Sequence, residues 1–247
     1  MSQQSIYLAM SGLNATMDRM TAATNNLANA STVAFKAQQP VFQAQPLYGQ
    51  GLPDRVDVAS AEDTADFKPG PIEQTGRPLD VAVNGSGWIA VQAADGSTAL
   101  TRNGSLSLSA SGILQTSDGN PVLGQGGAPI SLPPLQNVTI GGDGTISGSL
   151  AGQPATQITT LNRLLLANPK PATLTRRTDG LFQDQTGTPT PDAAVKLQVG
   201  ALEGSNANPV SLMMTMIENT RMFQMQTELV HMVINQGQGQ SSPLTLS

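Results

Sequence analysis

The sequence predicts an α+β protein in which coiled-coil-like N- and C-terminal helices form one unit and an all-β domain is inserted between them. All ten methionines lie in the two ends of the chain, up to Met20 and from Met213 to Met232. The middle instead holds short alternating runs separated by Gly-containing turns, a pattern typical of β structure. We expect four segments: an N-terminal helix and its exit turn at 1–35, an extended linker at 36–74, a central β domain at 75–200, and at 201–247 a C-terminal helix that pairs with the N-terminal one.

The first element is expected to be a helix with a narrow apolar seam. At alternating steps of four and three residues, six of seven positions are apolar, a heptad pattern that favours packing against a partner helix. These positions are Ile6, Met10, Leu13, Met17, Met20, Thr24 and Leu27. We expect the helix to end near Asn29, because asparagine tolerates the left-handed conformation that often ends a helix.

A second helix is predicted from about 209 to 236. Pro209 suits a first helical turn, the preceding SNAN offers N-cap side chains, and Gly237 and Gly239 mark the far end. Its seam has the same spacing, and Ile217 broadens it. The seam positions are Met213, Met216, Thr220, Phe223, Thr227, Val230 and Ile234.

The middle of the chain is predicted to be a series of short strands. VTIGGDGTISG (138–148) has the pattern of a hairpin, and LNRLLLANP (161–169) and VKLQVGAL (195–202) are expected to be further strands. Strands at such regular intervals indicate an all-β domain. The segment 36–74 contains five prolines and scattered polar residues, so we expect it to be extended and irregular.

Composition argues against several classes of function. Charged residues make up 12% of the chain and the net charge is −5, without a basic stripe, so we expect no nucleic-acid binding. No run approaches the roughly 20 apolar residues of a membrane span, so no direct membrane insertion is expected. The N-terminus does not have the pattern of a cleaved signal peptide. Without cysteine and with one histidine, the chain is expected to hold neither metal nor cofactor.

No catalytic constellation is predicted, and we expect a protein that is not an enzyme. His231 has neither a cysteine nor a second histidine to work with, so a solvated or contact-forming role is preferred. A carboxylate pair acting on carbohydrate stays open as a weaker alternative, because such pairs are distant in sequence. Trp88 and Phe67 are expected to pack in a core or interface rather than bind a ligand.

Three stretches resemble the flagellar rod and hook protein family. NNLANASTVAFK (25–36) is similar to that family's N-terminal signature, and LEGSNANPVSLMMTMIENTRMFQMQ (202–226) is similar to its C-terminal signature. The stretch from GPIEQTGRPLDVAV to LTRNGSL (70–106) resembles the shared β-domain core. Ala34 stands where the signature has glycine, which puts a positive-φ turn there in doubt.

The resemblance implies a structural subunit of the bacterial flagellar basal-body rod, most like the proximal rod members. Such a subunit would be exported by the flagellar type III apparatus without a cleaved signal peptide. It would assemble in the periplasmic rod with other rod proteins and copies of itself, forming through its terminal helices a helical tube that transmits torque. The alternatives are a distal rod role and, from another class, a β-domain binding module or hydrolase that its helices dimerise.

The two seams and the resemblance together give a set of expected subunit-interface residues. Asn25 and Asn26 are expected either to bond backbone at the helix exit or to contact a neighbouring subunit, and the contact is favoured. The set is Ile6, Met10, Leu13, Met17, Met20, Asn25, Asn26, Leu27, Asn29, Thr32, Phe35, Leu202, Ser205, Asn206, Met213, Met216, Ile217, Arg221, Phe223 and Val230.

Overall fold

The computed structural model describes residues 2–46, 56–60, 64–150 and 157–239, and the chain divides into two compact units. The first, here called the helical unit, contains both terminal helices. It consists of the described residues of Met1–Asn29, Gln38–Asp66 and Ala207–Ser247. The second, here called the β unit, consists of the described residues of Ala30–Ala37 and Phe67–Asn206.

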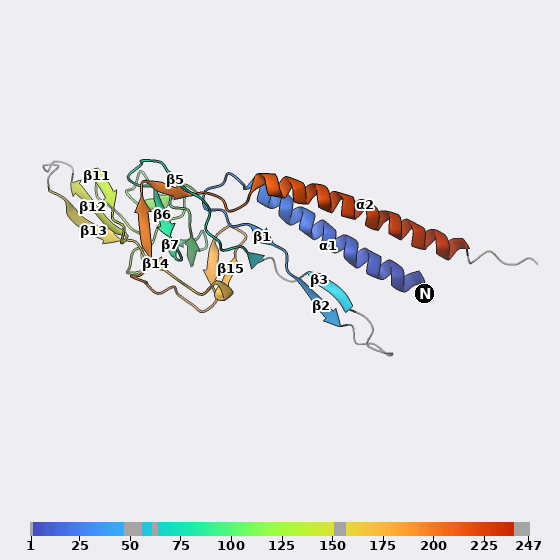
Figure 1. The fold of residues 1–247 in the computed structure, drawn as a ribbon. Helices are drawn as coiled ribbons and strands as arrows, with labels where there is room; N and C mark the ends of the chain where they lie inside the picture. The colour runs from blue at the N-terminus through green and yellow to red at the C-terminus, as the bar shows by residue number, and fades with distance from the viewer. Residues whose placement is uncertain (1, 47–55, 61–63, 151–156, 240–247) are drawn as a thin grey trace, which may run out of the picture. The chain divides into compact units, whose positions relative to one another are not determined.

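Two long helices, α1 (Ser2–Ala28) and α2 (Pro209–Gly239), pack side by side and run antiparallel in the helical unit (Figure 1). The predicted start of α2 is confirmed. Asn208 caps it, because its Oδ1 accepts hydrogen bonds from the backbone N–H groups of Val210 and Ser211 at 3.0 and 3.2 Å. The structure therefore confirms the α+β class and the existence and type of both terminal helices.

Only part of the predicted seam of each helix lies at the contact between α1 and α2. In each helix, some members of the predicted seam are half-buried. They are Leu13, Met20 and Leu27 in α1, and Met216, Phe223, Thr227 and Val230 in α2. The other members are exposed, and the contacts between subunits predicted for several of them stay a prediction. These are Met10, Met17 and Thr24 in α1, and Met213, Ile217, Thr220 and Ile234 in α2. The Ile6 side chain lies outside the described part of the structure.

The observed seam also uses residues that lie just before members of the predicted seam. In α1 these residues are Thr16 and Ala23, and in α2 they are Leu212, Asn219 and Gln226, all buried or half-buried. The distance between packed helices depends on the side chains at the contact, and alanine and threonine allow a closer approach than methionine. The seam within the chain is therefore built from smaller and more polar residues than the sequence pattern indicates.

Of the buried polar groups in this seam, one has hydrogen-bond partners and another has none. The Thr16 hydroxyl lies 3.0 Å from both the Gly12 carbonyl oxygen and Gln226 Oε1, so it always has an acceptor. Asn219 is only 7% exposed, and its Nδ2 has no hydrogen-bond partner within the described part of the chain. A buried donor without an acceptor destabilises the folded state. The helix pair is therefore less stable than its apolar contacts alone would make it.

The C-terminal end of α1 differs from the prediction in one respect. Helix α1 ends at Ala28, close to the expected position, but Asn29 does not adopt the left-handed conformation. Asn29 N–H and Nδ2 both donate to the Asn25 carbonyl oxygen, at 3.2 and 2.9 Å. The asparagine thus ends the helix by satisfying a last-turn carbonyl with its side chain.

Four short strands lie beside the helices where an irregular linker was expected. Strand β1 (Gln38–Gln39) pairs with β4 (Thr64–Ala65), and β2 (Phe42–Pro46) pairs with β3 (Val56–Ser60), both antiparallel. Strands β1 and β3 contact α1. Arg19 of α1 lies 4.8 Å from the centre of the Phe42 ring, a cation–π distance. This segment therefore forms part of the helical unit.

The β unit is an assembly of short antiparallel strands, as predicted. One sheet has five strands in the order β14-β7-β8-β16-β15, another has the order β11-β12-β13, and three pairs complete it (β17-β6, β18-β5, β10-β9). The strands are β5 (Ile72–Gln74), β6 (Val81–Asn84), β7 (Trp88–Gln92), β8 (Thr98–Thr101), β9 (Leu106–Leu108), β10 (Leu114–Thr116), β11 (Leu135–Ile140), β12 (Thr145–Leu150), β13 (Thr159–Arg163), β14 (Leu166–Ala167), β15 (Leu174–Arg176), β16 (Phe182–Asp184), β17 (Lys196–Val199) and β18 (Ala201–Glu203).

One aliphatic core runs through this unit. Its members come from most of the strands, and Ile89, Leu106 and Ile146 are fully buried examples. The predicted hairpin at 138–148 is confirmed, since β11 and β12 pair around a turn in which Gly144 has a φ of 83°. Strand β18 matters most for the site, because it pairs with β5 and carries Glu203.

Replacing Asn219 with alanine is expected to stabilise the helix pair. The change removes the unpaired buried amide, and we expect the free energy of unfolding to rise by about 1–3 kcal/mol. The matched control is Thr220→Ala on the exposed neighbouring position, which gains only helix propensity, roughly 0.5 kcal/mol. Urea unfolding followed by far-UV circular dichroism measures both. If Asn219→Ala is less stable than Thr220→Ala, the amide stabilises the helix pair after all.

Candidate assembly site

The two terminal signature stretches meet inside the β unit around one buried carboxylate. Glu203 Oε1 accepts a hydrogen bond from Lys36 Nζ at 2.7 Å, and Oε2 accepts one from Arg102 Nη1 at 3.0 Å. The side chains of Lys36, Glu203 and Arg102 are 0%, 1% and 4% exposed, respectively. We call these three residues the buried ion triad. Because buried charges are costly unless paired and hydrogen-bonded, the triad is stable only as a set.

The other polar atoms of the triad are mostly satisfied by backbone. Lys36 Nζ donates to the Lys68 carbonyl oxygen at 2.8 Å, and Arg102 Nη2 donates to the Gly85 carbonyl oxygen at 2.7 Å. Arg102 Nε has no hydrogen-bond partner among the described residues, but the guanidinium lies 5.4 Å from the centre of the Trp88 ring. These bonds hold three separate segments of the β unit against the triad.

Gly70 brings another backbone segment to the same carboxylate. Its N–H donates to Glu203 Oε1 at 2.9 Å. A Cβ at this position would lie 2.1 Å from the Gly204 carbonyl oxygen, which is far inside van der Waals contact. Only glycine therefore allows the chain to approach Glu203 this closely.

Asn206 forms a second connection between the two signature stretches. Its Oδ1 accepts a hydrogen bond from Ala37 N–H at 2.7 Å, and its Nδ2 donates to the Lys68 carbonyl oxygen at 3.0 Å. Its backbone N–H donates to the Phe35 carbonyl oxygen at 3.2 Å. Residues 34–37, which follow α1 in sequence, are thus fixed to residues 203–206, which precede α2.

Ala34 adopts the left-handed conformation at the position where the signature has glycine. Its φ is +58°, and it is the only non-glycine residue with a positive φ in the described part of the chain. Its N–H donates to the Glu203 carbonyl oxygen at 2.7 Å. The turn therefore keeps its conformation without glycine. An L-residue with a side chain pays roughly 1–2 kcal/mol for this conformation.

An aromatic cluster borders the triad. Trp88 and Phe182 have ring centres 4.8 Å apart, and Phe67 meets both rings nearly edge-on. The Arg176 guanidinium lies between Phe35 and Phe182, 5.0 and 5.3 Å from their ring centres, and donates to the Lys36 carbonyl oxygen. Phe35 is half-buried here. These contacts support core packing for Trp88 and Phe67.

The asparagines at the end of α1 bond within the chain. Asn26 is 5% exposed, and its amide makes two bonds to the backbone of Gln38: Oδ1 accepts from the N–H at 2.7 Å, and Nδ2 donates to the carbonyl oxygen at 2.9 Å. Asn25 is exposed, and its Oδ1 accepts from Asn29 Nδ2 at 3.2 Å. Bonding to backbone at the helix exit, one of the two expectations, describes Asn26.

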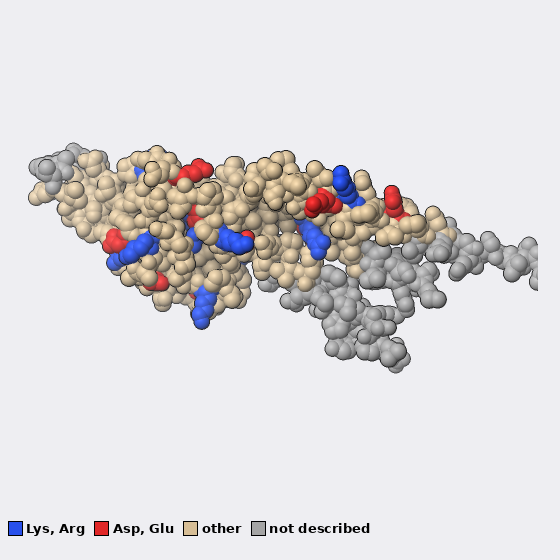
Figure 2. Space-filling model, in the orientation of Figure 1, with Lys and Arg blue, Asp and Glu red and all other residues tan. Residues whose placement is uncertain are grey.

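Both helices present a methionine-rich surface to solvent. We call the exposed stripe of α2 its outer face, and Met10 and Met17 the outer face of α1. The apolar members of the α2 outer face are Val210, Met214, Ile217, Met225 and Met232, and the exposed charged residues Arg221 and Glu228 lie on the same stripe. At about 100° of rotation per residue, this stripe lies about 180° from the seam that packs on α1. In Figure 2, charged side chains interrupt the neutral surface of the helices at only a few places.

The other expected interface residues fall into two groups. Leu202 is half-buried in β18, where it pairs with Glu73, whereas Arg221 is exposed on α2. Ser205 and Thr32 belong to the two signature stretches in the β unit. No partner chain is present in the structure, so the interface role of the whole set stays a prediction.

Lys36, Glu203 and Arg102 were not among the expected site residues. A signal was available for two of them: Lys36 ends the first signature stretch, Glu203 is the second residue of the other, and they carry opposite charges. Charged residues are scarce in this chain, so such a pair is conspicuous. Arg102 carried no comparable signal, because only the fold brings it to Glu203.

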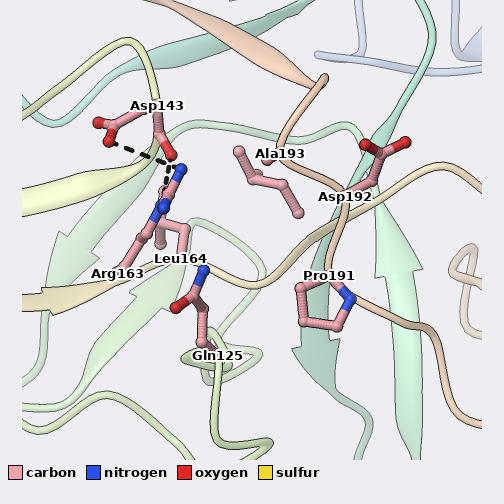
Figure 3. A pocket seen from close by; sticks show the side chains of 8 residues that line it. Gln125, Asp143, Arg163, Leu164, Pro191, Asp192 and Ala193 are labelled. Atoms are coloured by element: carbon pink, nitrogen blue, oxygen red, sulfur yellow. Dashed lines mark hydrogen bonds and ion pairs between the residues drawn. The ribbon is translucent and has the colours of Figure 1, made fainter.

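The hollows of the β unit offer little room for a substrate. One of about 10 Å³ is lined by Asp143, Arg163, Asp192 and five neighbours, and holds about one water molecule (Figure 3). Arg163 Nε donates to the Asp143 carbonyl oxygen at 3.0 Å. The Thr145 hydroxyl and N–H, together with Arg163, lower the pKa of Asp143, so its carboxylate is held charged.

A second hollow, of about 200 Å³, has two carboxylates in its lining and no histidine, lysine or arginine. It is lined by Ala167, Asn168, Pro169, Asp184, Pro189, Thr190, Pro191 and Asp192. Among the described residues, no group of three or more His, Cys, Asp or Glu side chains could hold a metal ion. Neither described helix combines the length and the apolar character needed to cross a membrane.

Comparison with known proteins finds one family in three separate stretches of the chain. Residues 6–36 match the model described as flagella basal body rod protein, residues 82–148 match the flagellar hook protein FlgE/F/G D1 domain, and residues 198–233 match the flagellar basal body rod FlgEFG protein C-terminal region.

Full-length relatives agree with these matches. The flagellar basal-body rod protein FlgF of Salmonella typhimurium is 38% identical over 97% of both chains. FlgF of Escherichia coli is 40% identical over 92% of this chain and 93% of that protein. The flagellar basal-body rod protein FlgG of Buchnera aphidicola subsp. Schizaphis graminum is 29% identical over 92% of this chain and 94% of that protein.

Replacing Glu203 with glutamine is expected to destabilise the β unit strongly. The substitution keeps the shape but leaves Lys36 and Arg102 buried without a counter-charge, which costs about 3–5 kcal/mol. The control is Asp95→Asn, which breaks an exposed ion pair with Arg177 and should lower stability far less than Glu203→Gln. Trp88, the single tryptophan, reports unfolding by fluorescence. A Glu203→Gln chain that loses no more than the control would show that the triad contributes little.

Replacing Ala34 with glycine is expected to stabilise the same unit. Glycine adopts the observed φ without strain, so we expect a gain of about 1 kcal/mol in the free energy of unfolding. Ala37→Gly, three residues on and without a positive φ, should instead lose roughly 0.5–1 kcal/mol. Urea unfolding followed by Trp88 fluorescence compares the two. A loss of stability in both variants would mean that the left-handed turn is not strained.

Proposed function

The chain belongs to the flagellar basal-body rod protein family, and we propose that it is a structural subunit of the proximal rod. It is a structural protein and not an enzyme. Two relatives named FlgF are 38% and 40% identical, whereas two relatives named FlgG are each 29% identical. This difference supports the proximal role over the distal one.

The observation that carries the proposed mechanism is the exposed methionine surface of the two helices. The outer faces of α1 and α2 are turned away from the seam, so pairing within the chain leaves them uncovered. Burying one methionine side chain contributes about 1.5–3 kcal/mol, so covering several of them can stabilise an interface. Methionine also adapts to neighbours of different shape, which suits contacts between non-identical subunits.

Contacts through these faces generate a tube. The outer face of α2 differs from that of α1, so a contact between them is heterologous, and heterologous contacts that do not close form open helical assemblies. The partners are other rod subunits and copies of this chain, which meet at Met10 and Met17 on α1 and at the α2 outer face. The predicted interface residues Met213 and Arg221 also lie on exposed parts of α2.

The buried ion triad suits a subunit that carries torque. It ties the segment that follows α1 in sequence to the segment that precedes α2, within one closely packed unit. Close-packed interiors deform little under load. Export through the flagellar export apparatus without a cleaved signal peptide, and a place in the periplasmic part of the rod, complete the proposal.

A charge on the α2 outer face is expected to abolish assembly without unfolding the chain. Met214→Glu places a carboxylate in the proposed interface, where desolvating it is costly. Thr215→Glu adds the same charge one residue away, about 100° around the helix. Motility and flagella per cell are measured in cells whose own copy is deleted, with circular dichroism as the folding check. Equal motility of both variants would exclude the outer face from assembly.

A further inference from the structure

Every sulfur atom of this protein lies in the two end segments of the chain. The chain has no cysteine, and its ten methionines all belong to the end segments. Seven of them are between 41% and 61% exposed. These seven are Met10, Met17, Met213, Met214, Met222, Met225 and Met232. Met20 and Met216 are half-buried in the seam between the helices.

This arrangement separates two classes of methionine on the same helices. Met214, Met225 and Met232 belong to the α2 outer face, whereas Met216 packs toward α1. Oxidation of a thioether needs access of the oxidant to sulfur, so exposed methionines react faster than packed ones. The β unit contains neither cysteine nor methionine, so an oxidant of thiols or thioethers has no target there.

We propose that the outer faces are methionine-oxidation sites, at which peroxides convert the free subunit into a form that does not assemble. The sulfur lone pair attacks one oxygen of a hydroperoxide. The S–O bond forms as the O–O bond breaks, and the displaced oxygen takes up the hydroxyl proton and leaves as water or an alcohol. Sulfur is oxidised by two electrons, the peroxide is reduced by two, and the product is methionine sulfoxide.

The consequence depends on where the sulfoxide forms. A sulfoxide is polar and accepts hydrogen bonds, so it disrupts apolar interfaces rich in methionine. On an outer face it leaves the seam between α1 and α2 untouched, and the folded chain keeps both helices and its β unit. Covering the outer face in an assembled rod would also cover these sulfurs. Free subunits are therefore sensitive and incorporated subunits are protected.

This inference rests on the proposed assembly role. Its first test is chemical and independent of assembly. The purified full-length chain is treated with limiting hydrogen peroxide, and sulfoxide is measured at each methionine by peptide mass spectrometry. Met214, Met225 and Met232 should be oxidised before Met20 and Met216, without loss of the far-UV circular dichroism signal. Equal rates at all positions, or loss of the helical signal as oxidation proceeds, would overturn the proposal.

The second test is made in cells that lack their own copy of this protein. They produce either the original chain or a variant in which the outer-face methionines Met10, Met17, Met214, Met225 and Met232 are all replaced by leucine, and new flagella are counted with and without sublethal hydrogen peroxide. Each chain is compared with its own untreated culture, so any effect of leucine on assembly cancels. Peroxide should lower the count roughly tenfold more for the original chain, equivalent to about 1.4 kcal/mol.

A third variant distinguishes failure of the oxidation proposal from failure of the proposed assembly role. Replacing Met214, Met225 and Met232 with glutamine imitates the polarity of the sulfoxide and should lower the flagellar count without peroxide. If the leucine chain and the original chain are equally sensitive to peroxide, the oxidation proposal is wrong and the assembly role stands. If the original chain restores no flagella in untreated cells, both fail.

Discussion

The pairing of Glu203 with two buried cations is the interaction on which the rest of the structure depends. A single carboxylate in strand β18 satisfies Lys36 from the N-terminal signature and Arg102 from the sheet, and it also accepts the N–H of Gly70. None of these charges is tolerable in an apolar interior by itself. The triad therefore enforces one arrangement of four chain segments, and the left-handed Ala34, the Asn206 bonds and the aromatic cluster all follow from it.

The helices show how far a periodic pattern can be trusted. Existence, type, approximate length and N-cap were predictable, because capping chemistry and heptad spacing are local. The face was not. The strongest apolar heptad contains Met17 and Met213, yet the chain packs Thr16 and Leu212 into its own seam. Spacing by itself identifies apolar positions without stating whether an intramolecular neighbour or another molecule covers them.

The sequence motifs that contribute to the site were visible in the sequence, but the interactions between their side chains were not. The signature stretches were visible in sequence, and strands and turns in the middle followed from Asp-Gly spacing. The sequence predicted that the two chain ends form one unit, but not that Lys36 pairs with Glu203, because these residues are 167 positions apart and only tertiary structure joins them. The short strands of residues 38–66 were missed for a similar reason. They are stabilised by contact with α1, not by their own composition.

The separation of the triad in sequence also sets the order in which the chain can fold. Lys36 is near one end, and its counter-charge is in the last strand of the β unit. Until residue 203 is available, burying Lys36 would leave an unpaired ammonium in the interior, so the segment around Ala34 stays open. Contacts so distant in sequence form late. If the chain is exported end-first through a narrow channel, as proposed, the segment around Ala34 stays open until almost all of the chain has emerged, and β18 then completes the β unit.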